Sequence, residues 1–149
     1  MSKPASRGRS LARSLAVQAL YQWQVGGQPI VNVVPHMLTD HAEPKTDAAF
    51  FTLLVEGVSE HVNELDEALR PHVDRSLESI DPVERAILRL GAYELKMHQE
   101  TPYRVVINES IELAKVFGAE QGHKYVNGVL DKAAKDLRPF EMAAEKKTS

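Results

Sequence analysis

The sequence predicts an all-α fold, a compact bundle of six or seven helices. Apolar residues recur at helical spacing in almost every periodic segment, and no segment alternates strictly between apolar and polar residues. No Asn-Gly or Asp-Gly pair lies between two β-rich runs, so a hairpin signal is missing. The chain has 149 residues, of which 43% are hydrophobic. That length fits one domain, or two small helical halves that share a core.

Three helices are predicted in the first 70 residues. The first spans about Ser10–Val25 and ends at a pair of glycines. The second spans about Ile30–Leu38, although Pro35 lies within its apolar stripe and removes a backbone donor. A long helix then begins after Asp47, a residue type favoured as an N-cap. A kink or break near Val62 would divide this helix into two.

The strongest local signal is Asp81-Pro82-Val83-Glu84, which follows a short helical turn over residues 73–80. Asp81 can accept hydrogen bonds from free amides of the first turn, and Pro82 suits the first helical position. The helix that begins there continues to about Met97.

Two more helices complete the predicted bundle. Thr101-Pro102 repeats the start signal, and the helix after it ends before Gly118, for which a left-handed conformation is predicted. The last helix runs from about Gln121 to Leu137, and Pro139 closes it. The expected organisation is a basic flexible N-terminal arm over residues 1–9, a helical domain over 10–139 and a flexible tail over 140–149.

Charge is distributed unevenly along the chain. The net charge is −3, and the cationic and acidic residues separate into a basic head over residues 1–39, an acidic body over residues 40–84 and a slightly basic remainder. Such asymmetry suggests contact with a polyanion at the head, although a solvated N-terminus would look the same. The acidic body offers a face for a basic protein partner or a solvated surface that keeps the protein soluble.

Enzyme, metal and membrane functions lack support in the sequence. The chain has no cysteine, no phosphate-binding glycine-rich loop and no His-Glu-x-x-His pair. Glu109 and Glu112 lie three residues apart, but a solvated face paired with Lys115 explains them better than a metal. No segment has 18 consecutive apolar residues and no secretory signal is recognisable, so we expect a cytoplasmic protein. We expect no catalytic residues, no cofactor and no metal.

Two surfaces could bind nucleic acid. The first is the predicted outer face of the first helix, where Tyr21 lies among polar and cationic residues. The residues assigned to this face are Arg7, Ser10, Ser14, Val17, Gln18 and Tyr21, flanked by Arg9 and Arg13. Single-stranded RNA is usually gripped by cations that contact phosphates and exposed rings that stack on bases. Packing of Tyr21 against a neighbouring helix is the alternative.

The second surface is the start of the last helix, where free amides and the positive end of the dipole favour a phosphate. It carries Lys124, Tyr125 and Asn127, the last of which can read a base edge. Gly128 costs stability inside a helix, which suggests close approach by another helix or by a ligand.

Four long motifs stand out along the chain: AVQALYQWQ at 16–24, VERAILR at 83–89, PYRVVINE at 102–109 and HKYVNGVLD at 123–131. In this order they resemble the NusB family of transcription antitermination factors. The resemblance runs from about residue 6 to residue 139.

The resemblance implies two packed three-helix subdomains and a non-catalytic function. Proteins of this family bind the boxA element of rRNA transcripts together with NusE, the small-subunit ribosomal protein S-ten. With other Nus factors on RNA polymerase, they suppress termination and aid rRNA synthesis and maturation. A helical protein-binding adaptor without sequence-specific RNA binding is the alternative, and either a monomer or a homodimer is compatible with the family.

The resemblance also assigns site residues. The family's RNA contacts map onto Arg7, Arg9, Arg13, Gln18, Tyr21, Lys124, Tyr125 and Asn127. The NusE side maps onto the middle helices, where Glu84 and Arg85 lie.

Overall fold

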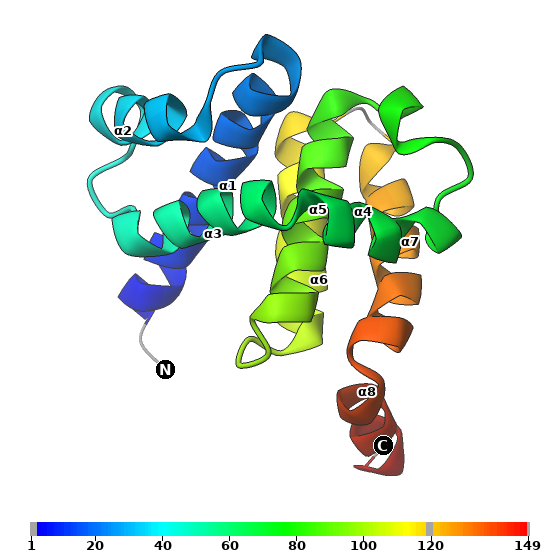
Figure 1. Cartoon of the computed structure of the whole chain (residues 1–149). Helices are drawn as coiled ribbons and strands as arrows, with labels where there is room; N and C mark the ends of the chain where they lie inside the picture. Colours follow the sequence, from blue (N-terminus) through cyan, green and yellow to red (C-terminus); the bar gives the residue numbers. More distant parts are fainter. Residues whose placement is uncertain (1–2, 119–120, 149) are drawn as a thin grey trace. The chain divides into compact units, whose positions relative to one another are not determined.

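The computed structural model describes residues 3–118 and 121–148 of the chain (Figure 1). The chain divides into two compact units, residues 1–62 and residues 63–149. The described residues form eight α-helices and two 3₁₀ helices, and they contain no strand. The prediction of an all-α fold is therefore confirmed.

The first unit contains three helices, α1 (Lys3–Gly26), α2 (Ile30–Asp40) and α3 (Ala48–Glu60). Helix α1 packs against both α2 and α3. Asp47 caps α3 as predicted, because its carboxylate accepts a hydrogen bond from the Phe50 amide at 3.0 Å. Helix α2 continues through Pro35, which is exposed and faces away from the buried side of the helix.

Helix α1 begins earlier than the sequence predicts. Residues 3–9, expected to be a flexible arm, are the first turns of the helix. The carbonyl of Gly8 accepts a hydrogen bond from the Asp47 amide at 3.1 Å, which joins this segment to the connection between α2 and α3. The extra turns of α1 therefore contact a residue that is distant in the sequence, which local sequence patterns could not predict.

The predicted break near Val62 is confirmed. Helix α3 ends at Glu60, and α4 (Val62–Leu69) follows after a single residue, His61. The His61 amide donates to the Gly57 carbonyl at 3.1 Å, and its ring nitrogen Nδ1 lies 2.9 Å from the same oxygen. These contacts close the end of α3.

The second unit consists of α4, two 3₁₀ helices and four further α-helices. The elements after α4 are η1 (Arg70–His72), η2 (Leu77–Ser79), α5 (Pro82–Met97), α6 (Tyr103–Phe117), α7 (Gly122–Leu137) and α8 (Pro139–Thr148). Helices α5, α6 and α7 pack against one another and supply most of the buried apolar side chains of this unit. Asp81 caps α5 as predicted, with its carboxylate accepting from the amides of Val83 and Glu84 at 2.9 and 3.3 Å.

Two predicted helix-end signals are wrong. Thr101 does not cap α6. Instead, the first amide of that helix, at Tyr103, donates to the carboxylate of Glu141 at 2.9 Å. Gly118 is extended, with φ −91° and ψ 178°, rather than left-handed. A Cβ at this position would lie 2.8 Å from the Ala114 carbonyl oxygen, so close backbone approach explains the glycine.

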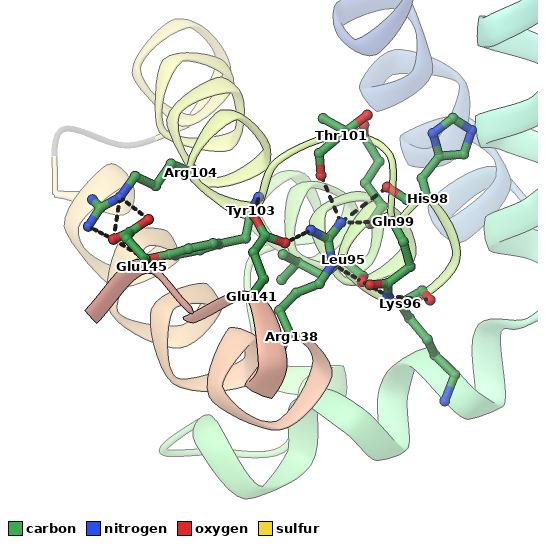
Figure 2. A network of polar contacts seen from close by, with 11 residues as sticks. Leu95, Lys96, His98, Gln99, Thr101, Tyr103, Arg104, Arg138, Glu141 and Glu145 are labelled. Atoms are coloured by element: carbon green, nitrogen blue, oxygen red, sulfur yellow. Dashed lines mark hydrogen bonds and ion pairs between the residues drawn. The ribbon is translucent and has the colours of Figure 1, made fainter. Parts of the chain in front are cut away.

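The segment expected to be a flexible tail forms helix α8 instead. Its carboxylates bind the start of α6, since Glu141 accepts from the Tyr103 amide and Glu145 accepts from the Tyr103 hydroxyl at 2.9 Å. Glu145 also pairs with Arg104 (Figure 2). These contacts connect residues about 40 positions apart, so local patterning could not predict them.

Arg138, between α7 and α8, joins the same network (Figure 2). Its side chain is fully buried and pairs with Glu141. Its guanidinium also donates to four backbone carbonyls at the end of α5 and in the following turn, those of Glu94, Leu95, His98 and Thr101. An arginine therefore supplies additional donors to carbonyls at the end of α5 and in the turn that follows it.

Among the helices of the described residues, none combines the length and the hydropathy needed to cross a bilayer.

Candidate nucleic-acid interface

The outer face of α1 exposes an aromatic ring among polar side chains. Arg7 and Gln18 are exposed, and Tyr21 retains 41% of its accessible surface. Ser10 and Ser14 on the same face are half-buried. Tyr21 is therefore exposed in part, and neighbouring residues cover the rest of its side chain.

This polar face is narrower than the sequence predicts. Val17, which was assigned to the outer face, is only 2% exposed. It belongs to a continuous buried surface of α1 that also includes Ala16 and Leu20. Helical periodicity places a residue at an angle around the axis, but neighbouring elements decide how wide the covered sector is.

Arg9 and Arg13 both contact Phe50 of α3, which the sequence did not associate with them. Their guanidinium carbons lie 4.4 and 5.1 Å from the ring centroid, within cation–π range. Arg9 is half-buried, whereas Arg13 is only 4% exposed. A side chain this deeply buried does not present its charge to a phosphate, so Arg13 contributes to the core of the first unit.

At the start of α7, Lys124 and Asn127 are exposed and Tyr125 is half-buried. The Tyr125 hydroxyl donates to a carboxylate oxygen of Asp74 at 3.0 Å. The guanidinium of Arg75 lies 5.2 Å from the Tyr125 ring centroid and also hydrogen-bonds Asp74. The bonds from Arg75 and Tyr125 lower the pKa of Asp74 to about 2, so this carboxylate stays charged at neutral pH.

Burial and the bond to Asp74 together raise the pKa of the Tyr125 phenol, which therefore remains a neutral donor. The Tyr125 hydroxyl is bonded to Asp74 and the side chain is half-buried. Tyr125 therefore offers less surface for stacking on a base than the exposed Tyr21 does. Local sequence could not reveal this partner, since Asp74 precedes Tyr125 by 51 residues.

A hollow of about 230 Å³ opens beside Tyr125 in the second unit. Its lining includes His72, Lys124, Gly128 and Lys132, so two lysines face the same space. Apart from its own stretch of helix, no described atom lies within 4 Å of the position that a Cβ on Gly128 would take. Close helix packing, one of the two explanations considered for Gly128, is therefore wrong within the described residues, because this side of α7 borders open space.

The two residues assigned to a protein partner have clear local contacts. Arg85 donates to the carbonyls of Leu77 and Glu78, both at 3.2 Å, and so holds η2 against the start of α5. Glu84 is half-buried beside Gly122, where its carboxylate would lie 2.9 Å from an added Cβ. Burial, with the nearby charge of Asp81, raises the pKa of Glu84.

Six glutamates of the acidic body could form the face for a basic protein partner, and they are divided between the units. Glu56 and Glu60 are exposed on α3 of the first unit. In the second unit, Glu64 pairs loosely with Lys96 at 3.9 Å, and the other acids of this set are Glu67, Glu78 and Glu84. Where side chains are described, no three His, Cys, Asp or Glu residues are grouped to hold a metal ion.

Comparisons with known proteins agree on one family. The model of the NusB family matches residues 10–135. A transcription antitermination protein NusB from Pseudoalteromonas translucida is 53% identical over 136 residues, covering 91% of this chain and 98% of that protein. A protein of the same name from Xylella fastidiosa is 54% identical over 134 residues, covering 90% and 85% of the two chains.

Solved structures share the fold. NusB of T. maritima superposes with a TM-score of 0.81 at 28% identity, covering 91% of this chain and 96% of that one. A chain from the crystal structure of antitermination factors NusB and NusE in complex with dsRNA gives a TM-score of 0.80 at 29% identity, with 87% and 98% coverage. The chain belongs to the NusB family of transcription antitermination factors, which are regulatory proteins and not enzymes.

Proposed function

We propose that this protein binds the boxA element of rRNA transcripts together with NusE, the small-subunit ribosomal protein S-ten. In this proposal the pair joins other Nus factors on RNA polymerase, suppresses termination and aids rRNA synthesis and maturation. A structural relative at 29% identity has been crystallised with NusE and dsRNA, which supports NusE and RNA as classes of partner.

The observation that carries the RNA-binding proposal is the exposed ring of Tyr21 on a polar face of α1. An exposed aromatic side chain beside Arg7 and Gln18 offers a stacking platform next to a phosphate contact and an amide. Arg9 lies on the flank of this face and keeps part of its surface accessible. Arg13 is left out of the proposed contacts because it is buried.

The start of α7 supplies a second set of contacts. Lys124 is exposed and can neutralise a phosphate, while the exposed Asn127 amide can both donate to and accept from a base edge. Tyr125 contributes its accessible ring edge. For NusE we propose the region around Glu84, where Arg85 positions the polypeptide and the acidic side chains suit a basic ribosomal protein.

A titration of labelled boxA RNA and a scrambled RNA, at two salt concentrations, tests this function. With Arg7, Arg9 and Lys124 each neutralising one phosphate, the slope of log K against log salt is about −2 for a single strand. Addition of NusE should tighten boxA binding through coupling of the two sites, and boxA should tighten NusE binding by the same factor. A protein-binding adaptor would show neither preference for boxA nor a steep salt dependence, and that result would overturn the proposal.

Tyr21→Ala tests the stacking role directly. Loss of one stacked base costs about 1–3 kcal/mol, so the variant should bind boxA about 5- to 150-fold more weakly. The matched control is Tyr21→Phe, which retains the ring and should bind nearly as well as wild type. Circular dichroism should show unchanged helicity, because the ring is exposed. Equal binding by Tyr21→Ala and wild type would refute stacking at this position.

A further inference from the structure

A second, smaller hollow lies in the first unit beside the polar face of α1. Ser14 and Gln18 form one wall, and His41, Glu43 and Thr46 from the connection between α2 and α3 form the other. Leucine side chains of α1 complete the lining. The hollow has a volume of about 90 Å³. Such a volume is far below the 300–1,000 Å³ of pockets that enclose drug-sized ligands, and it suits a single small ring.

The polar groups around this hollow are largely uncommitted. Among the described residues, neither the Glu43 carboxylate nor the Thr46 hydroxyl has a hydrogen-bond or ion-pair partner. The Gln18 amide makes only a long contact of 3.4 Å to the Ser14 carbonyl, beyond the usual range for a strong bond. His41 touches His36 edge-on, with ring centroids 5.4 Å apart. Acceptors, a hydroxyl and an amide therefore remain for a ligand.

The charge of the hollow indicates which chemical group of a ligand it can bind. Glu43 is exposed and acidic, so it repels a phosphate rather than binding one. A carboxylate accepts hydrogen bonds only, which requires a donor on the ligand. On an unpaired base, the exocyclic amino group is such a donor, and Glu or Asp accepting from N4 of cytosine is a recognised pairing.

The hollow also continues a surface already assigned to RNA. Gln18 precedes Tyr21 by three residues on the same exposed side of α1, a rise of about 4.5 Å along the helix. A strand with one base stacked on Tyr21 can therefore direct a neighbouring base toward Gln18. His41 adds an exposed imidazole, a ring type on which unpaired bases stack.

We propose that this hollow is a base-reading pocket that takes a single unstacked cytosine of the bound RNA. In it, Glu43 accepts from the amino group, and Gln18 and Thr46 contact the remaining polar edge. Cytosine is chosen over purines because the volume suits one ring. The inference rests on the proposed RNA-binding function and names residues, in the α2–α3 connection, that would determine its specificity.

A base-replacement series tests the pocket. A set of boxA RNAs, each with one cytosine replaced by uracil, is titrated against the wild-type protein, Glu43→Gln and Glu56→Gln. For wild type, one replacement should weaken binding by about 5- to 100-fold, because uracil presents an oxygen to the carboxylate where cytosine presents a donor. In Glu43→Gln the side-chain amide can turn either atom toward the base, so binding of the two RNAs should differ by less than about two-fold.

Glu56→Gln is the matched control, since it removes the same charge from an exposed position of the first unit outside the hollow. It should retain the wild-type preference for cytosine. Retained preference in Glu43→Gln, or a wild type indifferent to every cytosine replacement while still preferring boxA over scrambled RNA, would overturn the pocket alone. A wild type without preference for boxA would overturn the proposed function and the pocket with it.

Discussion

Replacement of Arg138 by alanine should destabilise the second unit strongly. The guanidinium is fully buried and donates to the Leu95 carbonyl at 2.6 Å, to the Thr101 carbonyl at 2.9 Å and to two others at 3.1 Å. Three of these four oxygens keep a second partner when Arg138 is lost. Those of Glu94 and His98 bind backbone amides, and that of Leu95 binds the Gln99 side chain.

The expected decrease in the free energy of unfolding follows from the contacts that Arg138→Ala removes. The Thr101 carbonyl loses the only described donor it has, which costs about 1–3 kcal/mol for a buried acceptor. Loss of the buried methylene stem and of the pairing with Glu141 adds a similar amount. The expected decrease in the free energy of unfolding is the sum of these two contributions, about 2–6 kcal/mol.

Urea unfolding followed by circular dichroism measures this change. The midpoint should fall substantially with an unchanged m-value. Arg138→Lys should show an intermediate loss, because an ammonium cannot span the carbonyls that the guanidinium reaches. Arg70→Ala is the control, since Arg70 is exposed and makes a single 3.3 Å contact with Glu67, and it should cost less than about 0.5 kcal/mol. A loss below about 1 kcal/mol for Arg138→Ala would refute the reasoning.

Two further predictions concern helix ends. Asp81→Ala should lower the free energy of unfolding, measured in urea, by about 1 kcal/mol because it removes the N-cap of α5. Asp81→Asn should retain most of the stability, since asparagine also caps helices. Equal losses in the two variants would contradict a capping role. For Glu145, bonds from Arg104 and Tyr103 lower the pKa below the ordinary value of 4.5. The contact between α8 and α6 should therefore be complete above pH 4.5 and lost as pH falls through the lowered pKa. An NMR titration of the carboxyl carbon should show a higher pKa in Arg104→Ala than in wild type, and identical pKa values would contradict the assigned cause.

The sequence was most informative where structure depends on neighbours in the chain. The caps at Asp47 and Asp81 were predictable because an N-cap bonds to amides two or three residues ahead. The break that was anticipated near Val62 lies at His61, between α3 and α4. These features need no information from distant segments.

Predictions failed where a distant residue replaced the local partner. The first amide of α6 is bound by Glu141, 38 residues away, so Thr101 has no capping role. The residues beyond Pro139 lack strong periodicity, yet they form α8 because their carboxylates find Tyr103 and Arg104. A pattern within a short stretch of sequence cannot indicate partners that lie so far away along the chain.

The candidate site shows the same division. The sequence alone identified the family, the helical class and the polar face of α1 that carries Tyr21, because these depend on residue order and helical period. Only the tertiary structure decided that Arg13 and Val17 are buried and that Tyr125 is held by Asp74. It alone brought Glu43 of the α2–α3 connection to the side of Gln18. The physical reason is that helical periodicity sets the direction of a side chain, whereas exposure and hydrogen-bond partners depend on which other segment packs there.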